Sequence, residues 1–252
     1  MGTDEKIILL AALFREIGKF ELYCNVDSQN ENLNFCFNLV EKQPDLLLKV
    51  LGLEEETESS SEDYLEKFRH LTATSSLVVQ NEDKLSEAMR LAHRLACGDN
   101  TPPPVPENDP NASSFLTSIF HTINLTNTVE LPVKYINHEV LSISELNLLD
   151  ESNITNGSCK KYKKEDYNKF IVELNTILQS YEKIGDFPSF YNLLLNHFEH
   201  YFWCLPVDNN PEHTGISLFN YMKDVAGLAH AIILTENSDN LTLINVELVG
   251  KV

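Results

Sequence analysis

Apolar residues recur three and four positions apart over most of the 252-residue chain, with polar residues between them. This spacing gathers apolar side chains on one face of an α-helix, so it predicts a mainly α fold. Helices are expected over residues 4–24, 33–53, 64–70, 82–96 and 165–183, from Pro188 onward, and after Ser217.

Turn-forming and capping residues set the expected limits of these helices. Gly18 should break the first helix and Pro44 the second, because glycine is conformationally free and proline lacks a backbone N–H. Asn81 is the expected N-cap of the helix over 82–96, since its side chain can accept a hydrogen bond from the first turn. Glutamates and serines crowd residues 54–63, which predicts an acidic loop in solvent.

The segment over residues 200–233 joins two helices of different character. An aromatic run over 201–203 ends the first helix, which closes at Pro206. After a polar loop, Ser217 is placed to start the second helix. That helix combines large apolar residues with small ones that let another helix approach closely: Leu218, Val225, Leu228, Ile232, Ala226, Gly227, Ala229 and Ala231. It is therefore predicted to be a buried packing helix.

Three stretches depart from the helical pattern. Residues 100–111 are rich in proline, which excludes a helix and predicts an extended linker. Residues 129–136 are expected to be extended as well. β-Branched residues are frequent over 241–249, which predicts a terminal strand. The expected organisation is one helical domain over residues 1–235, followed by a linker and strand over 236–252.

Charge restricts the classes of partner. The chain carries 19 basic and 38 acidic residues, a formal net charge of -19. Because phosphate contacts need lysine and arginine, little direct nucleic-acid binding is expected. The one basic patch could touch nucleic acid, although such a patch is more often a solvated helix start; it consists of Lys160, Lys161, Lys163 and Lys164, with Tyr162 among them.

Cysteines and apolar runs indicate the compartment. The five cysteines are scattered without a C-x-x-C pair, so neither a disulfide framework nor a zinc knuckle is predicted. No stretch approaches the roughly 20 apolar residues that a membrane span needs. Asp4 and Glu5 precede the first apolar run, unlike a signal peptide. We therefore expect a cytoplasmic protein with reduced thiols and no membrane partner.

Four motifs resemble one known family. ALFREIGKF over residues 12–20 resembles the family's ALLHDIGKF, and LAHRLACGD over 91–99 resembles IADxLSSGER. YFWCLPVD over 201–208 and ISLFNYMK over 216–223 resemble KYxWxxPSDT and VSLYDHxK near the end of the same domain. The family is the N-terminal HD domain of the large, polymerase-like subunit of type III-A (Csm) CRISPR effector complexes. The resemblance covers nearly the whole chain, is specific in order and spacing at four places, and is weakest over residues 25–65.

The resemblance implies a fold. We expect a circularly permuted HD-like helical domain in which the helices that carry Arg15 and Tyr221 lie side by side. Residues 247–252 resemble a degenerate first strand of the family's palm-like domain. The palm-like domains that make cyclic oligoadenylate in the family are not in this sequence.

The resemblance also implies a chemistry and its loss. In the family, the HD domain cleaves single-stranded DNA with metal ions held by a His-Asp pair and further ligands. Those positions fall here on Arg15, Glu16, His93 and Tyr221, and all four depart from the family pattern. An arginine cannot ligate a cation, and its fixed charge opposes a divalent ion. We therefore expect a vestigial site with no catalytic residue, no metal and no other cofactor.

The resulting hypothesis is a structural, catalytically inactive HD domain in a type III CRISPR RNA-guided antiviral effector complex. Its expected partners are the other subunits and, through them, guide RNA and target RNA. The alternative is a metal-dependent single-stranded DNA nuclease of the HD type with rearranged ligands among Glu16, His70 and His93. A helical scaffold unrelated to CRISPR is a third possibility. Without an identified acidic partner, His197 and His200 are interpreted as structural.

Overall fold

The computed structural model describes residues 1–24, 35–53, 58–73, 83–96, 134–136, 148–150, 162–207 and 216–235. The prediction of a mainly α fold is confirmed. The helices are α1 (Thr3–Arg15), α2 (Ile17–Tyr23), α3 (Phe35–Lys42), α4 (Pro44–Leu51), α5 (Glu58–Thr72), α6 (Lys84–Ala96), α8 (Lys164–Gln179), α9 (Tyr181–Ile184), α10 (Phe187–Phe202) and α11 (Leu218–Leu234). Two short strands, β1 (Lys134–Ile136) and β2 (Leu148–Asp150), pair antiparallel.

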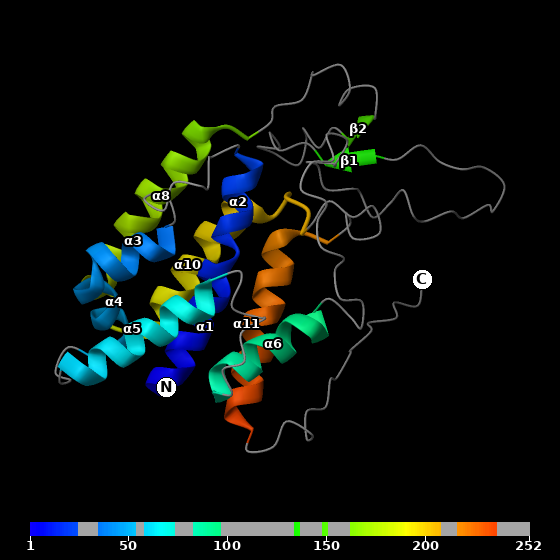
Figure 1. The fold of residues 1–252 in the computed structure, drawn as a ribbon. Coiled ribbons are helices and arrows are strands. Elements are labelled where there is room, and N and C mark those ends of the chain that lie inside the picture. Colours follow the sequence, from blue (N-terminus) through cyan, green and yellow to red (C-terminus); the bar gives the residue numbers. More distant parts are fainter. Residues whose placement is uncertain are drawn as a thin grey trace.

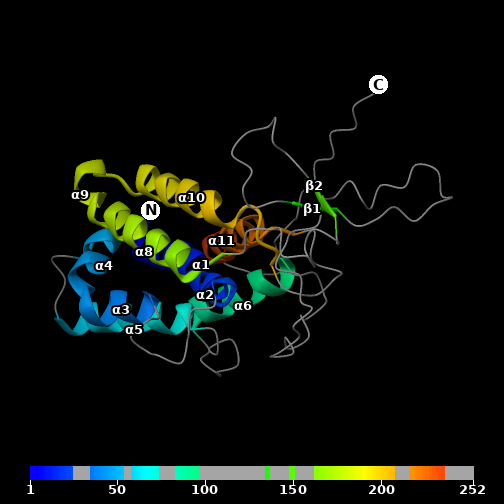
Figure 2. The ribbon, with the colours of Figure 1, turned by 90° about the horizontal axis from the view of Figure 1, so that it is seen from above.

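Helix α1 is the centre of the bundle. Every residue from Ile7 to Arg15 is buried, so the helix has no solvent face along that length. It packs against α4, α5, α6 and α11, which surround it in both views (Figures 1 and 2). The apolar residues of α1 are contiguous, and a helix that is apolar on all sides is buried on all sides. The spacing predicted one apolar face, whereas α1 is buried on all sides from Ile7 to Arg15.

The break after α1 falls at Glu16, and the prediction of a break at Gly18 is wrong. Gly18 lies inside α2, where a glycine costs about 1 kcal/mol relative to alanine. Burial of Ile17 and Phe20 on the same short helix offsets this cost, because each fully buried large apolar side chain contributes about 1.5–3 kcal/mol. Tertiary packing thus outweighs local helix propensity here.

Other helix limits confirm some sequence-based expectations and correct two. The interruption at Pro44 is confirmed, with Pro44 in the first turn of α4. The cap of α6 is Asp83, whose Oδ1 accepts from the backbone N–H groups of Leu85 (2.9 Å) and Ser86 (3.0 Å). Asn81 lies outside the described residues. The acidic loop over 54–63 is also corrected, because α5 begins at Glu58.

The connection from α10 to α11 is fixed by backbone pairing. The N–H of Val207 donates to the carbonyl of Ile216 (2.9 Å), and the N–H of Leu218 donates to the carbonyl of Leu205 (2.7 Å). Ser217 is the N-cap of α11, as predicted, and its hydroxyl accepts from the N–H of Asn220 (3.1 Å). These bonds hold the first turn of α11 in place.

Helix α11 packs most extensively against α6 and α1, which confirms that it is a packing helix. Ala226 and Ala229 are buried at these contacts. Gly227 is exposed, and a Cβ built on it would meet nothing within 4 Å, so its expected role in close approach is wrong. Lys84 of α6 donates from Nζ to the carbonyl of Ile233 (2.9 Å), the penultimate residue of α11.

The later helices differ slightly from their predicted limits. The helix expected over 165–183 is divided at Ser180 into α8 and α9. The helix at Pro188 is confirmed as α10, which is capped by Asp186. Strand β1 agrees with the extended stretch over 129–136 for its last three residues. The linker over 100–111 and the segment 236–252 lie outside the described residues.

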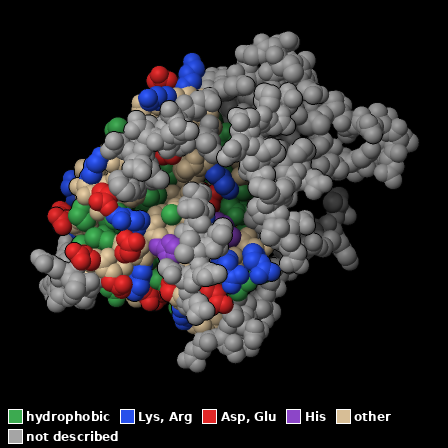
Figure 3. All heavy atoms as spheres, in the orientation of Figure 1, with side chains coloured by type: hydrophobic (Ala, Val, Ile, Leu, Met, Phe, Trp, Pro, Cys, Tyr) green, Lys and Arg blue, Asp and Glu red, His purple; other side chains and the backbone are tan. Residues whose placement is uncertain are grey.

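Charged side chains of both signs are interspersed over the described part of the face in Figure 3. Lys49 of α4 pairs with Glu182 of α9, and Arg69 of α5 pairs with Glu41 of α3. Exposed pairs of this kind contribute about 0–1 kcal/mol each, so they orient neighbouring helices more than they stabilise the fold. Within the described ranges, no helix is both long and apolar enough to cross a membrane.

Candidate functional site

The four positions singled out by the sequence come together where α1, α6 and α11 meet. Arg15 and Glu16 lie at the end of α1, His93 in the last turn of α6, and Tyr221 in the first turn of α11. Their exposed fractions are 5%, 3%, 8% and 6%. The prediction that the helices of Arg15 and Tyr221 lie side by side is confirmed. With Lys19 of α2, these residues are called the polar cluster below.

His93 and Tyr221 form a polar contact between α6 and α11. His93 Nδ1 lies 2.6 Å from the hydroxyl oxygen of Tyr221, and the two ring centroids are 5.7 Å apart. The other ring nitrogen, Nε2, is buried without a hydrogen-bond partner among the described residues. Burial lowers the pKa of His93 to about 4, although Glu16 opposes the shift. The imidazole is therefore neutral at neutral pH.

Arg15 caps a helix end. Its Nη1 donates to the carbonyls of Leu71 (3.0 Å) and Ala73 (2.9 Å), the last turn of α5 and the residue after it. The C-terminal end of a helix has unpaired carbonyls and carries roughly half a negative charge, so a guanidinium is favourable there. Burial lowers the pKa of Arg15, while the charges of Glu16 and Tyr221 raise it. Arginine remains charged even so.

Glu16 pairs with a residue that the sequence reasoning missed. Lys19 Nζ lies 2.9 Å from Glu16 Oε2 and 4.8 Å from the centre of the Tyr221 ring. Burial opposes ionisation of Glu16, but Lys19, and to a lesser degree Arg15, hold its pKa below the usual value. The signal was available, because residues three apart on a helix are neighbours. Lys19 therefore joins Arg15 as a second cation in the cluster.

The charges of the polar cluster oppose a divalent cation. Two cations, Arg15 and Lys19, accompany one carboxylate. At a separation of about 4 Å and an effective dielectric of about 20, each fixed positive charge opposes a divalent ion by roughly 8 kcal/mol. Within the described parts of the chain, no three His, Cys, Asp or Glu side chains are grouped so that they could hold a metal ion.

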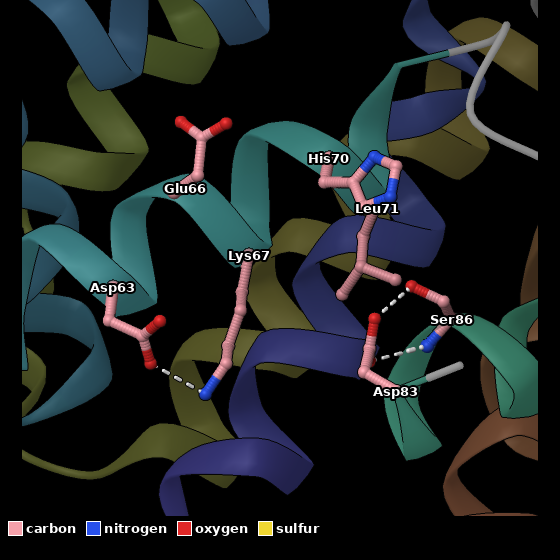
Figure 4. Close-up of a pocket in the computed structure, with 7 residues that line it drawn as sticks. All are labelled: Asp63, Glu66, Lys67, His70, Leu71, Asp83 and Ser86. Atoms are coloured by element: carbon pink, nitrogen blue, oxygen red, sulfur yellow. Dashed lines mark hydrogen bonds and ion pairs between the residues drawn. The ribbon is translucent and has the colours of Figure 1, made fainter. Parts of the chain in front are cut away.

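His70 lines a separate surface pocket of about 490 Å³ between α5 and α6 (Figure 4). The pocket lining includes neither Glu16 nor His93. Across from His70, Asp83 is occupied in capping α6, and Lys67 is directed toward Asp63, with Nζ 2.7 Å from its carboxylate. The structure therefore does not place His70 in the polar cluster.

His197 has the acidic partner that the sequence reasoning did not identify. Its Nδ1 lies 3.8 Å from Glu173 of α8, which also accepts a 2.8 Å hydrogen bond from the Tyr201 hydroxyl. The imidazole stacks on the ring of Phe170, with the two ring centroids 5.0 Å apart. Its Nε2 lies 3.2 Å from the carbonyl oxygen of Phe170. Burial lowers the pKa of His197. His197 is therefore still interpreted as a structural residue, now with Glu173 as its acidic neighbour. His200 contacts the ring of Tyr201.

The described cysteines are free thiols with little nucleophilic character. Cys24, Cys36 and Cys204 are buried and form no disulfide with one another. Burial raises the pKa of Cys24 and of Cys36 to about 12, and that of Cys204 to about 11. Because the thiolate is the reactive form, these side chains act as small apolar residues at neutral pH.

Comparison of the chain with protein-family models, with curated proteins and with solved structures finds no match in any of the three. The CRISPR resemblance therefore rests on the four sequence motifs. To this the structure adds one relevant geometric fact. Residues chosen from three distant motifs, around positions 15, 93 and 221, lie in a single buried cluster.

Proposed function

We propose that this chain is a structural, catalytically inactive HD-like domain, circularly permuted, of the large subunit of a type III CRISPR effector complex acting in the cytoplasm. The observation that supports the proposal best is the convergence of Arg15, Glu16, His93 and Tyr221. Motifs matched by chance have no reason to bring their divergent positions together across 128 residues of sequence. A common ancestral pocket accounts for it.

The residues that stand at the family's ligand positions have other roles in this fold, which accounts for the proposed loss of activity. Arg15 caps α5, and Glu16 is neutralised by Lys19. Tyr221 holds His93 across the α6–α11 interface. Each interaction stabilises the bundle, so a pocket that binds metal in the family would serve here as a packed polar centre. A complex retains such a domain because neighbouring subunits need its surface rather than its chemistry.

The test is purification of the tagged chain from its natural cells under non-denaturing conditions. The proposal expects the other complex subunits to co-purify, together with guide RNA of defined length that carries a common repeat-derived end. An untagged strain gives the background. Recovery of the chain without RNA, or with RNA that lacks a shared end sequence, would contradict the proposed complex.

A second candidate is the metal-dependent nuclease with rearranged ligands, and one observation favours it. The His93 imidazole is neutral and its Nε2 has no hydrogen-bond partner among the described residues. A neutral imidazole nitrogen is a common ligand for divalent transition metals. Titration with Mn²⁺ or Ni²⁺ separates the candidates, because the nuclease requires binding that is lost in His93→Ala.

A further inference from the structure

A groove of about 430 Å³ lies between α3 and α8 and shares no residue with the polar cluster. Its volume is within the range of ordinary ligand-binding sites. The apolar part of its lining comes from both helices: Phe35, Leu39, Tyr167, Ile171 and Val172. Val172 is 66% exposed, the highest fraction among the large apolar side chains described. Phe35, Leu39 and Tyr167 are themselves buried, so the apolar surface that the described fold leaves open in the groove comes from Val172 and part of Ile171.

Side-chain amides supply most of the polar part of the lining. These residues are Asn38, Gln43, Asn168 and Asn175. Each amide presents both a donor and an acceptor, which is the complement of a peptide group. Asn168 is exposed, and the Oδ1 of Asn175 has no hydrogen-bond partner among the described residues. The Oδ1 of Asn175 is thus not committed to an internal bond.

The groove differs in charge from the chain as a whole. Although the sequence contains 38 acidic residues, no Asp or Glu is among those that line the groove. The nearby acids of the same helices face other partners: Glu41 pairs with Arg69 of α5, and Glu173 accepts from Tyr201 of α10. Lys42, at one end of the lining, is exposed and makes no ion pair with a described residue. Glu21 of α2 accepts from the hydroxyl of the lining residue Tyr167, so Lys42 is the side chain of the groove that can pair with a carboxylate of a partner.

We propose that the groove between α3 and α8 binds an extended segment of a partner protein, with apolar side chains at alternate positions and a carboxylate that reaches Lys42. The lining from Phe35 to Lys42 spans about 10 Å of helix at roughly 1.5 Å per residue. At about 3.3 Å per residue, this length accommodates three or four extended residues. A helical partner would satisfy its own backbone groups and make no use of the exposed amide of Asn168.

Nucleic acid fits the groove less well than a peptide. Amides can hydrogen-bond to base edges, but a nucleic-acid strand also brings phosphates that need several cations. Lys42 is the only lysine or arginine among the lining residues described. A peptide-binding groove at this place is independent of the proposed CRISPR function.

The test starts with short random peptides displayed on phage and selected against the full chain. Selected peptides should share alternating apolar residues and at least one Asp or Glu. A fluorescent synthetic copy of the consensus is then titrated by anisotropy. Lys42→Glu and Val172→Glu should each weaken binding about tenfold, because one reverses the attracting charge and the other removes exposed apolar surface.

Lys183→Glu, at an exposed lysine of α9 outside the groove lining, is the matched charge control and should leave the affinity within about twofold. An oligouridine probe is titrated in parallel. Failure to enrich any peptide class, or equal weakening by Lys42→Glu and Lys183→Glu, would overturn the proposal. So would oligouridine binding that depends on Lys42 and competes with the peptide, since the groove would then be an RNA site.

Discussion

His93 and Tyr221 are 128 positions apart in the sequence, yet His93 Nδ1 and the Tyr221 hydroxyl oxygen lie 2.6 Å apart in the core. The contact joins the last turn of α6 to the first turn of α11. At the opposite ends of the same helices, Lys84 donates to the carbonyl of Ile233. The helices therefore run antiparallel, and a polar contact fixes their interface at each end.

Removing the Tyr221 hydroxyl should destabilise the protein. Tyr221→Phe leaves both ring nitrogens of buried His93 without a hydrogen-bond partner among the described residues, which costs about 1–3 kcal/mol. Urea denaturation measures the change. Tyr191→Phe is the matched control, because no hydrogen bond of the Tyr191 hydroxyl is found among the described residues, and it should change stability by less than about 0.5 kcal/mol. Equal losses in the two variants would argue against the His93 contact.

Stability should fall on mild acidification because of His93. Its pKa is about 4 in the folded chain and 6.5 in an ordinary environment, so between these values the unfolded chain binds the proton more readily. The contribution is intact above about pH 6.5, falls as the pH is lowered, and is fully lost below about pH 4, a total near 3 kcal/mol. His93→Gln should flatten this part of the pH profile. Parallel profiles for the two proteins would contradict the low pKa.

Arg15 should matter for stability rather than for chemistry. Arg15→Met removes two charge-assisted hydrogen bonds and leaves the carbonyls of Leu71 and Ala73 without them, which should cost about 3 kcal/mol. Arg94→Met, at an exposed arginine of α6, controls for loss of charge and should cost less than about 0.5 kcal/mol. Thermal or urea unfolding distinguishes them. If Arg15→Met is as harmless as the control, Arg15 is not a cap.

The sequence predicted the helices well but not the contacts that set their ends. Proline and capping residues mark the helix limits at Pro44, Pro188 and Ser217, because the effects of these residues on the backbone are local. The break at Glu16 could not be predicted, since burial of α2 outweighs the low helix propensity of Gly18. Side-chain partners that come together only in the folded bundle could not be predicted for the same reason.

The polar cluster was predictable in part. Motif resemblance selected four of its five members, but no pattern in the sequence links Arg15 to carbonyls 56 and 58 residues away. The acidic partner of His197 lies 24 positions upstream on another helix, beyond the reach of local spacing. The resemblance identifies which positions belong to the cluster, whereas the side chains that neutralise the charges at those positions are determined by packing.

If the cluster descends from a metal site, restoring the family residues should restore metal binding. The fourfold variant Arg15→His, Glu16→Asp, His93→Asp and Tyr221→His places ligand-type side chains at positions that already converge. Calorimetry with Mn²⁺ should detect binding to this variant. A threefold variant that retains Arg15 should bind about 10–100-fold more weakly, as for loss of one ligand or its support.

Circular dichroism must first show that both restored variants are folded. A folded fourfold variant that binds Mn²⁺ no better than the unaltered chain would contradict the correspondence between these positions and the HD ligands. The unaltered chain serves as the baseline for the calorimetry.

The unaltered chain should not cleave single-stranded DNA. A catalytic divalent ion needs several converging ligands, and here one expected ligand position is an arginine fixed to carbonyls and another is a tyrosine bound to His93. Lys19 further neutralises the one carboxylate, Glu16. Incubation of the purified chain with labelled single-stranded DNA and Mn²⁺, Ni²⁺ or Mg²⁺ should therefore leave the DNA intact, as in a reaction with chelator. Metal-dependent cleavage that disappears in His93→Ala or Glu16→Ala would establish a rearranged site and end the inactive assignment, whereas cleavage that persists in both variants would indicate a contaminating nuclease.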